Sequence, residues 1–189
     1  IDTSKPEVMC GAVSAGADII NDVAALQLPG ALEAAAEMGV PVCLMHMQGR
    51  PATMQENPHY DNVMREIIEF LNQRIEMCCA AGLSHDQIVV DPGFGFGKNL
   101  SHNLQLLRNL DKFSVLRAPL MVGISRKGMI GQILGARLDQ RLPGSLACAV
   151  IAAQRGAHII RVHDVRATVD AIKIVNAVEH NDENRVDAL

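Results

Sequence analysis

Short apolar runs and amphipathic segments take turns along the chain. The run Ile88-Val89-Val90 is apolar at every position, whereas residues 61–81 carry apolar side chains at helical spacing. Each apolar run follows a helical segment and a glycine or proline, and each ends in polar residues. Strands that are apolar throughout and separated by helices are typical of a parallel sheet covered on both faces.

The pattern predicts six strands and six helices, with the first strand represented only by its end. The predicted strands are residues 1–3, 18–22, 40–47, 88–91, 119–124 and 157–162. The first predicted helix begins at the capping-box sequence Ser4-Lys5-Pro6-Glu7 and ends at Gly16. The other predicted helices are residues 31–38, 61–81, 101–110, 145–155 and 165–178.

Two α/β architectures fit this order, the (β/α)8 TIM-type barrel and the open doubly wound sheet. An open sheet gathers its site at one switch point, whereas a barrel can use every strand end. All six predicted strands end in polar residues, which favours the barrel. A closed barrel needs about eight strands, so we expect one truncated at its amino-terminal side, with about six strands present. The expected domain is residues 1–179, followed by a polar tail at 180–189.

The start of the sequence supports the same interpretation. Ile1-Asp2-Thr3 resembles the last residues of a strand, and no initiator methionine precedes it. We therefore expect this chain to be the carboxyl-terminal portion of a longer protein.

Composition narrows the class of protein. The 189 residues suffice for one domain, and 49% apolar with 20% charged residues is ordinary for a globular protein. A net charge of −4 with mixed signs argues against a nucleic-acid surface or a membrane patch. Five cysteines, two of them adjacent, form no metal motif and no even disulfide set, so we expect reduced thiols and a cytoplasmic protein.

A glycine-spaced loop follows the apolar strand that ends at Asp91. Its glycines, at positions 93, 95 and 97, let a backbone approach a ligand closely. Phe94 and Phe96 lie between them in a chain with only four phenylalanines, which favours a flat ligand. The alternative is a small satellite core into which both phenylalanines fold.

Two kinds of polar group follow the strands. Asn21 and Asp91 pair an amide with a carboxylate, which suits a flat heterocycle with donors and acceptors along one edge. The cationic or protonatable groups suit phosphate or diphosphate, and they are Arg126, Lys127, Arg161 and His163. The alternative for Lys127 and Arg161 is ion pairing with an internal carboxylate. No pair of histidines has the spacing of a metal site.

Six strings resemble, in order and spacing, the bacterial dihydropteroate synthases, which are pterin-binding enzymes of folate biosynthesis. They are Asp2-Thr3-Ser4-Lys5-Pro6, Ile20-Asn21-Asp22, Leu44-Met45-His46-Met47, Asp91 to Lys98, Ser125-Arg126-Lys127 and Arg161-Val162-His163-Asp164. The resemblance implies a pterin-binding barrel that condenses 6-hydroxymethyl-7,8-dihydropterin diphosphate with 4-aminobenzoate, releases diphosphate and is inhibited by sulfonamides. It also implies a homodimer when the protein is full length.

The same resemblance implies a role for each matched residue. Pterin binding is implied for Asp2, Asn21, Met45, Asp91, Lys127 and Arg161, and diphosphate binding for Arg161 and His163. The aminobenzoate site is implied at Phe96, Ser125, Arg126 and Lys127, and the catalytic set at Lys127, Arg161 and His163. Mg²⁺ is the implied cofactor, with its asparagine ligand in the part that we expect to precede Ile1.

We therefore expect no turnover from the isolated chain. Two alternatives stay open at this point. A pterin-binding methyltransferase would share the barrel and the amide–carboxylate pair but would have little use for the cations. A truncated barrel without catalytic activity would serve only as a folding or interaction module.

Overall fold

The computed structural model describes residues 1–50 and 52–179, so the polar tail expected at 180–189 lies outside the described residues. The helices are α1 (Pro6–Ser14), α2 (Ala31–Met38), α3 (Val63–Ala80), α4 (Leu100–Arg108), α5 (Gly128–Leu134), α6 (Leu142–Gln154) and α7 (Val165–Glu179). The strands are β1 (Ile20–Asp22), β2 (Val42–Met45), β3 (Ile88–Asp91), β4 (Met121–Val122) and β5 (Ile159–Ile160). Short 3-10 helices are η1 (His85–Gln87), η2 (Leu110–Leu116) and η3 (Leu138–Gln140).

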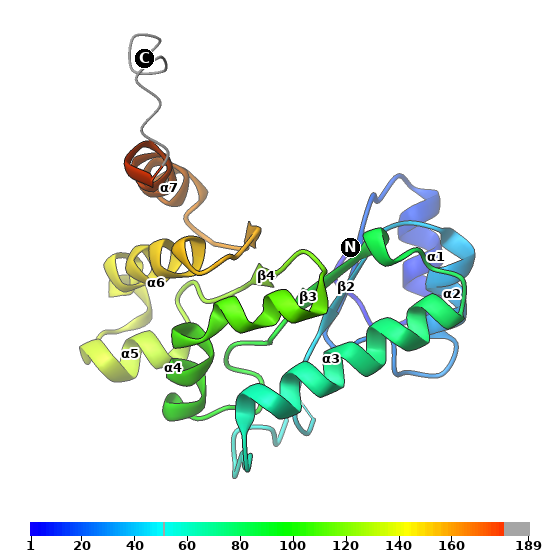
Figure 1. The fold of residues 1–189 in the computed structure, drawn as a ribbon, viewed down its shortest axis with the longest axis horizontal. Helices are drawn as coiled ribbons and strands as arrows, with labels where there is room; N and C mark the ends of the chain where they lie inside the picture. Colours follow the sequence, from blue (N-terminus) through cyan, green and yellow to red (C-terminus); the bar gives the residue numbers. More distant parts are fainter. Residues whose placement is uncertain (51, 180–189) are drawn as a thin grey trace, which may run out of the picture.

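The strands are parallel and lie side by side in chain order, as the alternation of strands and helices predicted. β2 pairs with β1 and β3, and β4 pairs with β5. Two single bridges extend this order, Asp2 to Asn21 at one end and Val90 to Leu120 in the middle. The strand ends therefore follow one another around one rim, with helices on the outer side (Figure 1).

The outer face of the sheet carries the main core. Ile20, Val42, Leu44, Ile88 and Val90 alternate along β1 to β3 and pack against the helices as part of one large apolar cluster. The residues between them face the other way. That inner face has only a small apolar cluster, made of Cys43, Val89 and Met121, so polar groups dominate its carboxyl-terminal end.

Most predicted elements are confirmed, and the differences have local causes. Lys5 rather than Ser4 is the N-cap of α1, and no side chain caps that helix. Ser4 Oγ instead donates to the buried Asp22 carboxylate, so the predicted capping box is wrong. The sequence pattern also missed α5, whose seven residues include two glycines that obscure helical spacing.

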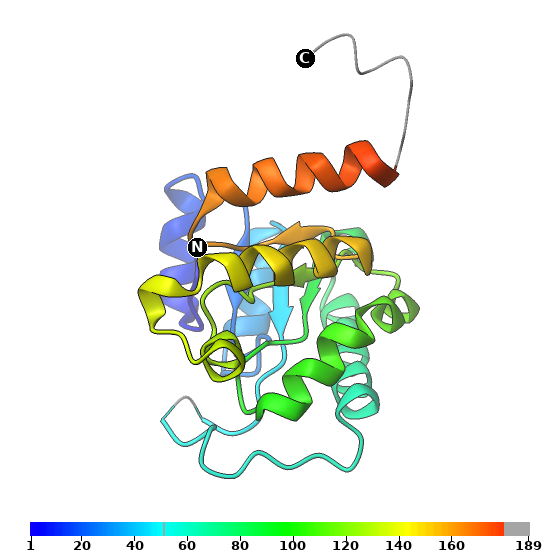
Figure 2. The ribbon, with the colours of Figure 1, turned by 90° about the vertical axis from the view of Figure 1, so that its left-hand side faces the viewer.

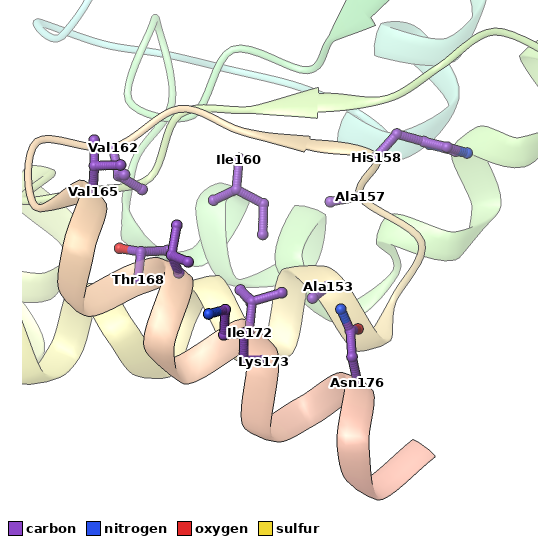
Figure 3. A pocket seen from close by; sticks show the side chains of 11 residues that line it. Ala153, Ala157, His158, Ile160, Val162, Val165, Thr168, Ile172, Lys173 and Asn176 are labelled. Carbon is purple, nitrogen blue, oxygen red and sulfur yellow. The ribbon is translucent and has the colours of Figure 1, made fainter. Parts of the chain in front are cut away.

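The carboxyl-terminal flank is covered less well than the rest. α7 lies beyond α6 at one end of the molecule (Figures 1 and 2), and Thr168 is its one buried residue. A cavity of about 610 Å³ lies between α7, β5 and α6, and Ile160, Val165 and Ile172 line it together with Lys173 (Figure 3). This cavity lies on the outer face of the sheet, between β5 and its covering helices.

Candidate functional site

Three side chains from the two ends of the sheet meet at the carboxyl-terminal rim. Asn21 Nδ2 donates to Asp2 Oδ2 at 3.0 Å, and Arg161 Nη1 donates to the same oxygen at 2.8 Å. The Asp2 carboxylate therefore links Asn21 of β1 with Arg161, which follows β5. Asn21 Oδ1 is buried and has no hydrogen-bond partner among the described residues, which leaves an acceptor facing the inner side of the sheet.

Asp91 lies at the centre of this rim. Its side chain is on the same face as Met45, the residue paired with it in the register of β2 and β3. Oδ1 accepts a hydrogen bond from Gly93 N at 2.7 Å. Burial raises the pKa of the Asp91 carboxyl, while the Gly93 N–H and the cations Arg161, Lys98 and Lys127 act to lower it. Several cations thus surround one buried acid.

The glycine loop divides its two phenylalanines between core and site. Phe94 is 1% exposed and belongs to the main core, so the expectation that both rings face a ligand is wrong for Phe94. Phe96 is half-buried, and Lys127 Nζ lies 4.2 Å from the centre of its ring, within cation–π range. Burial, together with Arg161, lowers the pKa of Lys127, and Asp91 opposes that shift.

The turn after β4 supplies two more predicted residues. Ser125 is buried, and its hydroxyl lies 3.0 Å from His163 Nδ1. Arg126 has a positive φ of 57° and donates to both Asp164 oxygens, at 3.0 and 2.6 Å. Arg126 is thus held in an ion pair with Asp164, a pairing that the sequence analysis did not predict.

These positions agree with an independent finding from sequence comparison. Residues 1–163 match the protein family described as "Pterin binding enzyme". The chain belongs to the pterin-binding enzymes. This family membership accounts for an amide, an acid and several cations that converge on one rim from strands far apart in the sequence.

The relatives of this chain that have names are dihydropteroate synthases. The dihydropteroate synthase of Escherichia coli (strain K12) is 57% identical over 185 residues, which cover 98% of this chain and 66% of that protein. The structure of Yersinia pestis dihydropteroate synthase in a sulfonamide drug complex has a TM-score of 0.94 and 55% identity, covering 96% of this chain and 66% of that one.

A third relative of known structure comes from Xanthomonas albilineans. Dihydropteroate synthase from Xanthomonas albilineans in complex with 7,8-dihydropteroate has a TM-score of 0.88 and 50% identity, and the match covers 94% of this chain and 65% of that one. The chain therefore spans about two thirds of the length of the relatives it matches.

Two buried polar residues lie behind the site, and sequence reasoning placed His46 at a strand end but assigned no role to Lys98. Lys98 is 2% exposed and His46 is 7% exposed, and their nitrogens lie 3.0 Å apart. Lys98 closes the glycine-loop string in the sequence, yet a lysine is seldom buried. The signal that could have identified it is its place in a loop, where backbone carbonyl oxygens need partners such as a lysine.

Neither a metal centre nor a membrane span is evident in the described ranges 1–50 and 52–179. No three His, Cys, Asp or Glu side chains gather there in a way that could hold a metal ion. In the same ranges, no helix combines the length and the apolar character that crossing a membrane requires.

Proposed function

We propose that this chain is the pterin-binding part of a dihydropteroate synthase, which condenses 6-hydroxymethyl-7,8-dihydropterin diphosphate with 4-aminobenzoate to give 7,8-dihydropteroate and diphosphate. The family membership of the chain and the names of its relatives support this assignment. One structural observation carries it: the unpartnered Asn21 oxygen and the buried Asp91 carboxylate share a rim with Arg161 and Lys127.

A pterin ring offers N–H donors and ring-nitrogen acceptors along its edge. Asn21 Oδ1 would accept from that edge, and Asp91 would accept two donors side by side as a carboxylate. Asp2 would continue the same hydrogen-bonding row, since it already contacts Asn21. Met45 is 1% exposed and lies beneath Gly93, so it would form the apolar floor of the pterin slot.

The cations serve the leaving group. The bond between the pterin methylene and the diphosphate oxygen breaks, and diphosphate leaves with the electron pair. Arg161 and His163 would stabilise the negative charge that develops there, while Asp91 favours the positive charge on the pterin. The amine of 4-aminobenzoate then bonds to the methylene and loses a proton. The aromatic amine is itself a nucleophile, so this step needs no activated serine or cysteine.

The aminobenzoate side would lie where Phe96 and Lys127 meet. The Phe96 ring offers an apolar face, and Lys127 and Ser125 offer polar contacts beside it. Lys127 would also hold the pterin, because its charge lies on the same rim as Asp91. Arg126 already has Asp164 as its partner, so we assign it a supporting place in this subsite.

Further proposals concern the protein as a whole. The sheet would be part of a closed barrel of about eight strands, and the barrel domain would span residues 1–179. Additional strands would enter between β5 and Asp2, where the Arg161–Asp2 ion pair joins the ends of the sheet. The whole protein would use Mg²⁺ through ligands outside this chain. It would act as a cytoplasmic homodimer, and sulfonamides would inhibit it by occupying the aminobenzoate subsite.

The assignment is tested with a chimera that joins residues 1–189 to the third of the Escherichia coli relative that they do not cover. Incubation with the pterin diphosphate and radiolabelled 4-aminobenzoate should give labelled dihydropteroate and an equal amount of diphosphate. Residues 1–189 alone serve as the comparison, and we expect them to give no product.

Two results would overturn the assignment. Failure of a folded chimera to release diphosphate would remove the synthase activity. Methyl transfer from a methylated reduced pterin, without diphosphate release, would instead support the methyltransferase alternative. Substitution of the exposed Lys112 by alanine should leave the synthase rate unchanged and controls for general effects of charge removal.

A further inference from the structure

Lys98 is a buried lysine with an unusual set of partners. Its Nζ lies 2.9 Å from the carbonyl oxygens of both Gly93 and Phe96, 3.4 Å from that of His46 and 3.0 Å from His46 Nδ1. None of these partners is a carboxylate. A lysine ammonium has three donors and no acceptor, so this site uses Lys98 as a hydrogen-bonding centre rather than as half of an ion pair.

His46 is in the protonation state that this arrangement requires. Burial and the nearby Lys98 charge lower the pKa of His46 to about 3, so its ring is neutral near pH 7. When Lys98 is protonated its ammonium can only donate, so Nδ1 of the neutral ring then accepts and the ring proton resides on Nε2. Burial also lowers the pKa of Lys98 to about 7, and Asp91 opposes that shift.

The loop that Lys98 holds is fixed by buried side chains at nearly every residue. Asn103 Oδ1 accepts from Gly95 N at 2.8 Å, and Tyr60 Oη donates to Gly97 O at 2.8 Å. Gly93 and Gly97 have positive φ values of 70° and 64°. A Cβ at Gly93 would lie 1.9 Å from His46 O, so the loop passes directly against the end of β2.

The geometry connects Lys98 to the aminobenzoate side of the site. Lys98 binds the carbonyl of Phe96, and the Phe96 ring packs against Lys127 Nζ. The stem of Lys127 also lies against Gly95, where a Cβ would come within 3.3 Å of Lys127 Cδ. Moving the Phe96 backbone would therefore move the surface that borders Lys127.

We propose that Lys98 is a positioning residue for the aromatic amine. Its ammonium ties the glycine loop to the end of β2 and thereby sets the place of the Phe96 ring. The kinetic consequences of this role rest on the proposed function, whereas its effect on the loop does not. It does not require Lys98 to touch either substrate.

The first test measures the loop without any enzyme assay. Lys98→Met keeps an unbranched side chain that is one atom shorter and removes its donors, and Lys112→Met is the matched control at an exposed lysine. Hydrogen exchange should become at least about tenfold faster at the amides of residues 93–97 in Lys98→Met, because the loop opens more readily without its buried donor. The rate should stay unchanged in Lys112→Met. Unchanged loop exchange in a folded Lys98→Met variant would overturn the proposal even if the chimera proves inactive.

The second test uses the active chimera. Lys98→Met should raise the KM for 4-aminobenzoate by about tenfold or more, while the dissociation constant of the pterin substrate changes by less than about threefold. Phe96→Ala should raise the same KM. In the double variant, Lys98→Met should add little, because the ring that it positions is gone. Additive effects, or equal losses for both substrates, would show a role in general folding instead.

A gentler variant keeps the proposal testable if Lys98→Met fails to fold. His46→Phe removes the Nδ1 acceptor and preserves the edge contact of the ring with Phe70, whose centre lies 5.0 Å away. It should speed exchange at residues 93–97 and raise the KM for 4-aminobenzoate in the same direction, by a smaller factor. No change in either measurement would contradict the proposed link.

Discussion

The first three strands of the sheet and its last strand pack against very different amounts of core. We call β1 to β3 with α3 the covered side, and β5 with α7 the open side. On the covered side, β2 and β3 are buried along their whole length, and α3 buries Val63, Ile67, Leu71, Arg74, Ile75 and Cys78. On the open side, β5 is partly exposed and α7 buries only Thr168. Asn21, Met45 and Asp91 belong to the covered side, whereas Arg161 and His163 follow β5 on the open side.

This difference separates two kinds of functional residue. The groups proposed to recognise the pterin ring are fixed by the same packing that stabilises the fold. The groups proposed to hold the diphosphate depend on local contacts with Asp2 and Ser125. Recognition of the ring is therefore expected to be rigid, and the anion-binding side chains are expected to rearrange more easily when a ligand arrives.

The largest expected effect is a loss of stability on the covered side. Leu71 is fully buried in α3, and Leu71→Ala should lower the free energy of unfolding by about 3 kcal/mol because it leaves a cavity in the main core. Val169 is 44% exposed on α7, so Val169→Ala should cost less than about 1 kcal/mol. Urea unfolding of both variants measures the difference, and similar losses at the two positions would contradict it.

Much of the covered side could be predicted from periodicity. Residues 31–38 and 88–91 were predicted with the bounds that the structure shows, because strong helix formers and an apolar run mark them clearly. Asp91 was correctly placed at a strand end, and the alternation along β1 to β3 determines which residues share its face.

The parts that escaped prediction depend on contacts between distant residues. Phe94 and Phe96 have the same neighbours in sequence, and only the three-dimensional packing sends one ring into the core and the other toward Lys127. Likewise, Lys98 contacts His46, which lies 52 positions away in the sequence. The Arg161–Asp2 contact joins residues 159 positions apart, which no local pattern could reveal.

The next effect concerns catalysis where the two sides meet. Lys127→Ala should lower kcat/KM of the chimera by well over tenfold, or about 2 kcal/mol, because a charged contact to the substrates is lost. Its unfolding should change little, since Lys127 contributes no ion pair at hydrogen-bond distance among the described residues. Steady-state kinetics beside urea unfolding separates these quantities, and wild-type kinetics in Lys127→Ala would count against its assignment.

A smaller effect is the pH dependence of stability that the buried His46 causes on the covered side. The pKa of His46 is about 3 in the fold and 6.5 as its ordinary value, so the unfolded chain binds the extra proton first. The stabilisation is present above pH 6.5 and is lost progressively as the pH falls toward 3. At about pH 5.5 the loss should be about 1 kcal/mol relative to neutral pH.

His46→Phe should remove that part of the pH dependence, while His85→Phe, at an exposed histidine, should retain it. Unfolding in urea is measured at several pH values between about 7.5 and 5, the range in which an ordinary histidine titrates. The free energy of unfolding plotted against pH gives the slope for each variant. A slope in His46→Phe equal to that of the wild type would mean that His46 is not buried in its neutral form.

The smallest expected effect tests the open side through the ion pair of Arg161 with Asp2. Both side chains are about half exposed, at 43% and 53%, so solvent screens their attraction. Arg161→Met should therefore change the free energy of unfolding by no more than about 0.5 kcal/mol. Pterin diphosphate binding should nevertheless fall by about tenfold or more, because the guanidinium is proposed to hold the diphosphate. Arg166→Met, at an exposed arginine of α7, should change neither quantity. A large loss of stability in Arg161→Met would instead mean that the contact with Asp2 holds the two ends of the sheet together, and the open side would then be structural rather than adaptable.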